Sequence, residues 1–408
     1  MPFREDAKDI NHSAEPVGRR QSAVITSYCY KSFAYDLMHL FYILFLFEVL
    51  IAVVAYTNVA EYVFMPVKKH TITLLSDKRQ ILYLLMALGV MLIIHAFRDP
   101  MTLEDTPDYA RAFEEARLKS MADVITKGYE ELKTEKGFAV FLKMVADVMP
   151  ITQMIFIITS AFMFCSFFVA IKRYSSIFWI SVFVLMTDSF PQSLFIVRGF
   201  FALSILLFSI PFIIKRQLLP YLLLCLVAFS IHTTSVIFFP VYFIYGIKNA
   251  FILTIVLAVG GVIFVLGFDI ILPYVVENFL SEYSVYILGA DNYEGGNWKM
   301  PAMLSAVLIF RIVVMKGHFF EEGINRFCSL VLILALLLYV AGLGFGLISR
   351  MALYFSNLTF LILPNTIQYI RNQTIQFISG VAYILFTGFF FLKSSTGVFW
   401  ADYQLISI

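Results

Sequence analysis

Long apolar stretches recur along the whole chain, separated by shorter polar segments. A transmembrane helix needs about 20 predominantly apolar residues, and many of these stretches approach that length. The pattern predicts an all-α fold, a polytopic transmembrane helical bundle with about twelve spans. The predicted spans cover residues 37–56, 80–97, 150–171, 177–190, 193–214, 217–231, 233–247, 250–269, 301–315, 327–347, 350–369 and 374–393.

The composition agrees with this class and excludes a soluble domain. Of the 408 residues, 60% are hydrophobic and only 14% are charged. The net charge of +2 gives no indication of a nucleic-acid partner. The four cysteines are scattered and indicate neither a disulfide framework nor a zinc site. We divide the chain into a polar N-terminal segment (1–36), a transmembrane domain (37–393) and a C-terminal tail (394–408).

Basic residues constrain the topology, because Lys and Arg accumulate on the cytoplasmic side of a membrane. If every segment crosses, the basic residues that follow the later spans all lie inside: Lys172, Arg173, Lys215, Arg216, Lys248, Lys316, Arg326 and Arg371. Fusing the two shortest segments, 217–231 and 233–247, would move the later basic residues outside. We therefore expect two crossings or a hairpin with its tip at His232. The same count puts the N-terminus outside, against the arginines near the chain start, so its side stays open.

Two long polar segments, 98–149 and 270–300, fall on the outer face by this count, the first directly after the second span. Within the first, Thr106–Lys119 has a proline near its start, followed by charged and apolar residues at helical spacing. This pattern predicts an amphipathic helix lying on the membrane surface.

Arg198 is the most informative polar residue, because it interrupts the apolar run Ser193–Ile214. A guanidinium cannot lose its charge, and in hydrocarbon it costs about 2.5–3.5 kcal/mol even on the mildest scales. We expect Arg198 to face a polar cavity with an anionic ligand. The structural alternative is an internal ion pair with an acid such as Glu48. Pro191 and Gly199 predict a broken helix that another group can approach closely.

A second group of candidates follows the second predicted span. His95, Arg98 and Asp99 are spaced to share one helix face, and Asp105 and Asp108 repeat the i, i+3 spacing in the following loop. The ordinary alternative is that these residues only mark a membrane boundary.

Two further candidates lie in later segments. His232 is three residues before Ser235, and a neutral imidazole near the boundary can accept a proton or donate to a substrate oxygen. Arg350 and Tyr354 lie one turn apart and can share a polar face. For His232 the alternative is a histidine that binds a carbonyl group, and for Arg350 it is an arginine that extends to the membrane boundary. We interpret Arg311 as an arginine that extends to the boundary.

Arg98, Arg198, His232 and Arg350 all fall at or near the outer half of the membrane in this topology. Arginine binds phosphate oxygens through paired hydrogen bonds, so several converging cations and a histidine suit a pyrophosphate group. No acidic triad or tetrad within the predicted spans suits a catalytic metal. We expect neither a metal nor a cofactor.

The order of these motifs resembles the EpsG-like family, whose members are similar to Wzy-type polysaccharide polymerases of O-antigen, capsule or exopolysaccharide. The resemblance covers roughly residues 80–370 and rests on RDPMTLEDTPDY (98–109), EKGF (135–138), VRGFFA (197–202), IHTTS (231–235) and SRMALYF (349–355). The sequence departs from the family pattern at Leu103 and Glu104, where Gly-Thr usually precedes the aspartate, and at Gly199, where glutamine is frequent.

The resemblance implies a GT-C-like glycosyltransferase fold and a multi-pass enzyme of the bacterial inner (cytoplasmic) membrane. The implied reaction transfers a growing glycan from undecaprenyl pyrophosphate to the next lipid-linked repeat unit on the outer face. The implied partners are this lipid-linked oligosaccharide, membrane lipid and a chain-length regulator.

In this reaction we expect arginines to neutralise the leaving pyrophosphate and a base to act on the acceptor hydroxyl. Arg198 and Arg350 are assigned to the pyrophosphate, and Arg98 to the donor phosphate or a sugar acid. His232 or Asp105 is assigned as the base. The predicted catalytic residues are His232, Asp105 and Arg198, and the predicted substrate-binding residues are Arg98, Arg198, Arg350, Asp108, Tyr109 and Tyr354.

Three other functions stay open. A flippase for lipid-linked oligosaccharides also needs cations in a membrane cavity, but it would be expected to show two similar halves, which the sequence lacks. An O-acyltransferase can use an intramembrane histidine but would reach its acyl donor from the inner side. An O-antigen-ligase-like transferase shares the chemistry and differs only in its acceptor.

Overall fold

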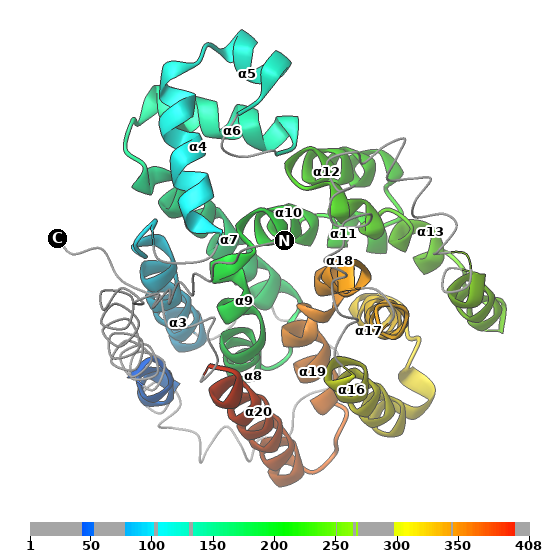
Figure 1. Ribbon diagram of the computed structural model, residues 1–408. Helices are drawn as coiled ribbons and strands as arrows, with labels where there is room; N and C mark the ends of the chain where they lie inside the picture. Colours follow the sequence, from blue (N-terminus) through cyan, green and yellow to red (C-terminus); the bar gives the residue numbers. More distant parts are fainter. Residues whose placement is uncertain are drawn as a thin grey trace, which may run out of the picture.

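The computed structural model describes residues 43–52, 78–101, 105–129, 134–249, 251–263, 267, 298–343 and 346–395. Over these residues the chain is helical, which confirms the predicted all-α class, and the helices pack around one apolar core (Figure 1). Helices Ile43–Ala52 and Phe251–Ile263 carry no label. The others are α3 (Lys78–Ala96), α4 (Thr106–Leu118), α5 (Met121–Lys127), α6 (Lys136–Val148), α7 (Gln153–Tyr174), α8 (Phe178–Val184), η1 (Leu185–Ser189), α9 (Phe190–Phe195), α10 (Val197–Leu207), α11 (Ile210–Ile214), α12 (Leu218–Ile231), η2 (Thr233–Phe238), α13 (Val241–Tyr245), α16 (Lys299–Met315), η4 (Lys316–His318), α17 (Ile324–Ala341), α18 (Gly346–Ser356), α19 (Thr359–Ile367) and α20 (Gln373–Ser395).

Three helices in the described part of the chain are long and apolar enough to cross a membrane, namely α7, α16 with η4, and α17. Every predicted span from residue 80 onward contains helix, but the chain between residues 177 and 247 is divided into short pieces. The number of about twelve spans and the likeness to GT-C enzymes therefore stay predictions. The predictions for residues 1–36, 270–297 and 396–408 lie outside the described residues.

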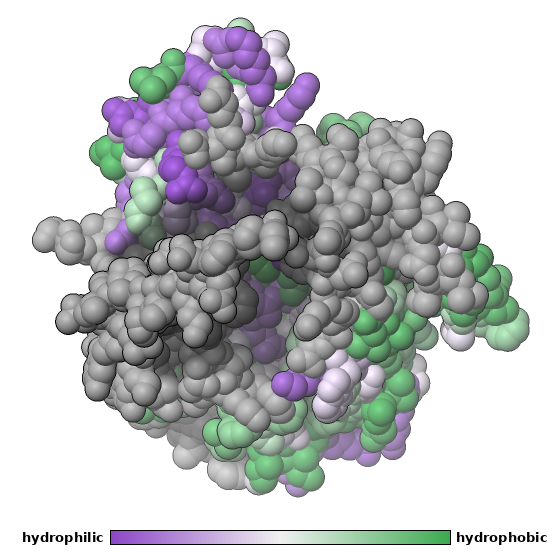
Figure 2. Space-filling view, in the orientation of Figure 1, coloured by the Kyte–Doolittle hydropathy of each residue, from purple (hydrophilic) through white to green (hydrophobic). Residues whose placement is uncertain are grey.

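Helices α4, α5 and α6 project from the bundle as one unit, which we call the outer unit (Figure 1). Figure 2 shows hydrophilic residues gathered over this unit, whereas hydrophobic residues gather around the helix Phe251–Ile263. This contrast fits the sequence-based expectation that segment 98–149 lies outside the membrane.

The predicted amphipathic helix exists as α4, but its apolar face does not lie on a membrane surface. Tyr109, Phe113 and Ala116 on this face are buried, and α4 packs against α6. The apolar stripe is therefore covered by protein, because α6 supplies an apolar face of its own with Phe138 and Leu142 buried.

The predicted break near Arg198 is confirmed and lies at Ile196. Pro191 sits in the first turn of α9, where its missing N–H is harmless, so α9 begins there without ending the preceding helix. Ile196 leaves the helical region with ψ of 60°, and α10 begins at the next residue. Arg198 therefore lies in the first turn of α10, where the helix dipole favours anions.

The two short segments around His232 form a hairpin, which is one of the two expected arrangements. Helix α12 ends at Ile231, and His232 has extended backbone before η2 begins. The returning arm lies beside α12, because the rings of Tyr221 and Tyr242 stack with centroids 5.2 Å apart. The Tyr221 hydroxyl also donates to the Phe238 carbonyl oxygen at 2.6 Å. His232 is thus held at the tip.

Arg311 does not extend to the membrane boundary, and that interpretation is wrong. Its side chain is fully buried and donates to Ser329 Oγ at 2.9 Å, Thr366 Oγ1 at 2.6 Å and the Asn325 carbonyl oxygen at 2.8 Å. Ser329 and Asn325 belong to α17, and Thr366 belongs to α19. Arg311 therefore connects its own helix, α16, to both of these helices. Its hydrogen bonds make burial tolerable.

Candidate functional site

The centre of the site is the Glu135 side chain, which lies just before α6 and is only 7% exposed. One carboxylate oxygen, Oε2, accepts from Arg198 Nη1 at 2.7 Å. The other, Oε1, lies 2.9 Å from His232 Nδ1 and accepts from the Thr233 backbone N–H at 2.8 Å and its hydroxyl at 3.0 Å. One carboxylate therefore joins the outer unit, the start of α10 and the hairpin tip.

Arg198 is held by further contacts with the outer unit. Its Nε donates to the Tyr109 hydroxyl at 3.3 Å, and Nη1 donates to Thr134 Oγ1 at 2.9 Å. The guanidinium carbon also lies 5.9 Å from the centre of the Tyr109 ring. Arg198 is paired with an acid, but that acid is Glu135 and not Glu48. The Arg198 side chain is 19% exposed, so solvent can reach the guanidinium.

The electrostatics of the cluster keep Glu135 ionised. Burial acts to raise the pKa of Glu135, but the hydrogen bond with His232 and the charge of Arg198 outweigh it and hold the pKa well below its usual range. A carboxyl group with a lowered pKa stabilises the fold above its ordinary pKa of about 4.3 and loses this contribution only as the pH falls through the lowered pKa. The Glu135 carboxylate is therefore ionised throughout the range from mildly acidic to neutral pH.

His232 connects the carboxylate to a small pocket. Donation from Nδ1 to Glu135 selects the tautomer in which Nε2 is the basic nitrogen. The same imidazole lines a pocket whose other polar side chains are Thr234, Arg350, Tyr354 and Asn357. The Tyr354 hydroxyl lies 3.4 Å from Thr234 Oγ1. A base and a cation thus share one pocket.

Gly199 forms part of the pocket wall. A β-carbon at this position would lie 3.7 Å from His232 Cδ2, an ordinary contact, but only 2.8 Å from Ile196 Cγ2. The close approach that the glycine allows is therefore that of the Ile196 side chain.

The structure brings together most of the predicted site residues, in two groups that share His232. Arg198 and Tyr109 belong to the Glu135 cluster, and Arg350 and Tyr354 belong to the pocket. Arg350 and Tyr354, which were expected to share one polar face, both line that pocket.

Of the three other predicted residues, Asp105 lies close enough to the Glu135 cluster for its charge to act on Tyr109, whereas Arg98 and Asp108 have partners of their own. Arg98 is fully buried; its Nη1 lies 2.8 Å from His95 Nδ1, and its guanidinium lies 4.5 Å from the centre of the Phe156 ring. Asp105 is the exposed N-cap residue of α4. Asp108 is exposed and forms an ion pair with Arg111. The assignment of these three residues to substrate stays a prediction.

Sequence reasoning assigned no role to Glu135, Thr134 or Asn357. The only signal for Glu135 was its place in the EKGF motif. A glutamate in a polar loop carries no pattern of its own, and its partners are 63 and 97 residues away.

Gly137 in the same motif sets how closely α6 approaches α12. A β-carbon here would lie 2.5 Å from the Ser230 carbonyl oxygen and 2.6 Å from Ser230 Cβ, which is closer than real β-carbons come to other atoms. Because a backbone oxygen cannot rotate away, α6 would have to move, and Glu135 lies only two residues before Gly137. The glycine therefore allows the carboxylate to reach Thr233.

Substitution Gly137→Ala is expected to reduce activity about 10-fold or more, since displacement by about 1 Å at a site costs up to about 100-fold. The measurement is the rate of the polymerisation reaction that the sequence predicts, with purified protein at equal concentration. The matched control is Gly89→Ala in α3, where a β-carbon meets nothing within 4 Å. Equal activity of the two variants would contradict this role of Gly137.

Comparison with known proteins gives one match. The EpsG family model matches residues 80–405, which includes all the residues of the two groups described above. None of the curated proteins and none of the solved structures that were compared matches the chain.

Proposed function

Because the chain belongs to the EpsG family, a Wzy-like polysaccharide polymerase family, we propose that it polymerises lipid-linked repeat units. The family implies a glycosyltransferase of the polymerase type in general. The specific reaction proposed here transfers the growing glycan from undecaprenyl pyrophosphate to the next lipid-linked unit at the outer face of the bacterial inner membrane. The observation that supports it most is the group of Glu135, His232 and Arg198 beside a pocket that contains Arg350.

The chemistry requires one bond to form and one to break. The acceptor hydroxyl oxygen attacks the anomeric carbon of the growing glycan, and the bond from that carbon to the pyrophosphate oxygen breaks. His232 Nε2 takes the hydroxyl proton, while Glu135 fixes the imidazole and stabilises its charged form. His232 is favoured over Asp105 as the base, because Glu135 orients His232 and Asp105 lies on the exposed start of α4.

Stabilisation of the leaving pyrophosphate is assigned to Arg198 and Arg350. Arg198 lies in the first turn of α10 and its side chain is partly exposed, and Arg350 is exposed at the pocket. Fixed cations and a helix N-terminus at the developing charge lower the barrier without reorganisation during the reaction. Arg98 is assigned a supporting role instead, because it is fully buried between α3 and α7.

The test compares a strain that lacks the gene with the same strain carrying the gene. Without the protein, long polysaccharide is expected to disappear from a gel, and lipid-linked single repeat units are expected to accumulate on the outer leaflet. Periodate, which enters intact cells poorly, should oxidise these units without lysis. Units that react only after lysis would indicate a flippase instead. Unchanged polysaccharide would contradict both functions.

A further inference from the structure

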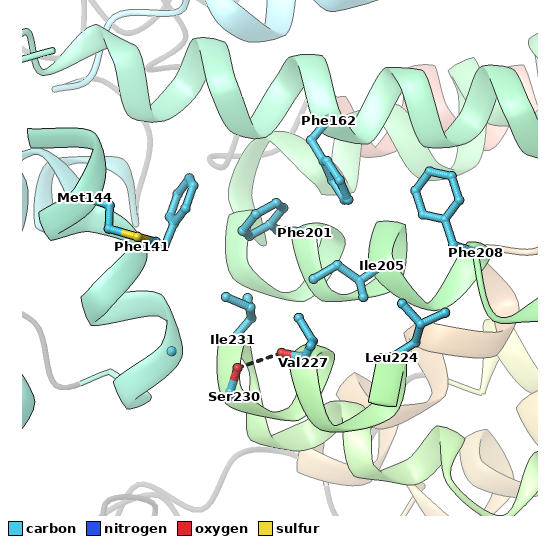
Figure 3. A pocket seen from close by; sticks show the side chains of 11 residues that line it. Phe141, Met144, Phe162, Phe201, Ile205, Phe208, Leu224, Val227, Ser230 and Ile231 are labelled. Atoms are coloured by element: carbon cyan, nitrogen blue, oxygen red, sulfur yellow. Dashed lines mark hydrogen bonds between the residues drawn. The ribbon is translucent and has the colours of Figure 1, made fainter. Parts of the chain in front are cut away.

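An apolar groove lies near the Glu135–Arg198–His232 cluster, since its lining includes Gly137 and Ile231, which are two residues from Glu135 and one residue from His232. It has a volume of about 540 Å³ and is lined by residues of α6, α7, α10 and α12 (Figure 3). This volume falls in the range of ordinary ligand sites, about 300–1,000 Å³. Its walls are almost entirely apolar, with four phenylalanine rings, Phe141, Phe162, Phe201 and Phe208.

The groove continues the helix face that carries Arg198. Phe201, Ile205 and Phe208 line it, and they follow Arg198 by three, seven and ten residues. Residues at this spacing lie on one face of a helical segment. At 1.5 Å per residue, the apolar stripe extends about 15 Å from the arginine. Arg198 therefore lies at one end of an apolar stripe.

The two other helices show the same order. On α12, Leu224, Val227 and Ile231 line the groove, and His232 follows directly. On α6, Phe141 and Met144 line it at the spacing of one helix face, and Glu135 lies just before the helix. Three apolar stripes thus end at the same charged cluster, which is the arrangement that an anionic amphiphile requires.

We propose that this groove binds the polyprenyl chain of the lipid-linked substrate, next to its pyrophosphate. This inference rests on the proposed function, because the pyrophosphate must lie at the cluster for the transfer to occur. The chain attached to the pyrophosphate then reaches the groove at Gly137 and Ile231, the lining residues nearest in sequence to Glu135 and His232. Because the isoprenoid chain comes from bilayer hydrocarbon and not from water, van der Waals packing in the groove holds it, and the rings supply flat contacts along the branched chain.

The first experiment uses Val227→Trp, with Leu226→Trp as the matched control. Both residues lie on the exposed side of α12, with 50% and 62% exposure, but only Val227 lines the groove. A tryptophan at 227 fills the groove and is expected to raise the KM for the undecaprenyl-linked repeat unit about 10-fold with kcat within about twofold. The control variant should match the wild type.

The second experiment needs no polymerase activity. A benzophenone amino acid is placed at position 227 or 226 of the full chain in vesicles of phosphatidylethanolamine and phosphatidylglycerol, with radiolabelled undecaprenyl pyrophosphate as the probe. Strong crosslinking at 227 and weak crosslinking at 226 supports the groove. Equal labelling at the two positions, or crosslinks to phospholipid that the probe does not displace, overturns it.

The two proposals fail in different ways. If wild-type protein polymerises but the Val227→Trp protein behaves like its control, the groove proposal is wrong and the proposed polymerase function is supported. If wild-type protein does not polymerise but the probe labels position 227 selectively, the groove proposal is supported and the proposed polymerase function is wrong.

Discussion

Glu135→Gln is expected to reduce polymer formation by about 100-fold or more, the usual contribution of a positioned acid–base pair. The carboxylate accepts from His232 and Thr233 on one oxygen and from Arg198 on the other. Glutamine has the same shape but replaces one acceptor by an amide donor. The ion pair with Arg198 is lost in either orientation, because glutamine carries no charge, and if the amide nitrogen faces Arg198 the hydrogen bond is lost as well. If it faces His232, the proton moves to the other ring nitrogen and the base is blocked.

The measurement is the length ladder of polymer made by purified protein from the lipid-linked unit. The control is Glu114→Gln in the same outer unit. Glu114 also pairs with an arginine, Arg117, but its side chain is 50% exposed, and exposed pairs contribute about 0–1 kcal/mol. A ladder of normal length and yield from the Glu135→Gln protein would show that the carboxylate serves packing alone.

The helices could be predicted from the sequence because hydropathy is a local property. Segment 80–97 corresponds to α3 and segment 374–393 to α20. Counting basic residues on each side of the membrane left two arrangements, two crossings or a hairpin with its tip at His232. The exact number of crossings did not follow, because the chain between residues 177 and 247 forms short helical pieces whose lengths do not reveal whether they span.

The site was only half predictable, because its decisive contacts join distant residues. The cost of a charge in hydrocarbon identified Arg198, but it did not identify Glu135, which lies in a loop where an acid is ordinary. For Arg311 the sequence predicted the wrong environment. This arginine was expected to extend to the membrane boundary, yet it is fully buried among hydrogen-bond acceptors of its own bundle. The number of satisfied partners is visible only in three dimensions.

Arg198→Lys is expected to lose nearly as much activity as Arg198→Ala, about 100-fold or more. The guanidinium donates from Nε to Tyr109 and from Nη1 to Thr134 and Glu135, in different directions. An ammonium is a point charge that lacks the planar fork and cannot hold these partners and a phosphate together. The control is Arg111→Lys, an exposed arginine that also pairs with a carboxylate. Near wild-type polymer formation by the Arg198→Lys protein would contradict recognition of a phosphate by the planar guanidinium.

A double-mutant cycle separates the two roles that Arg198 can have. If Arg198 only orients Glu135, the double variant with Arg198→Ala and Glu135→Gln should be no slower than Glu135→Gln alone, because the interaction is already lost. If Arg198 also stabilises the pyrophosphate, its removal must slow the Glu135→Gln protein further, and we expect an additional loss of about 10-fold or more. The 19% exposure of the Arg198 side chain favours the second result, since a cation that serves only an internal pair needs no access to solvent.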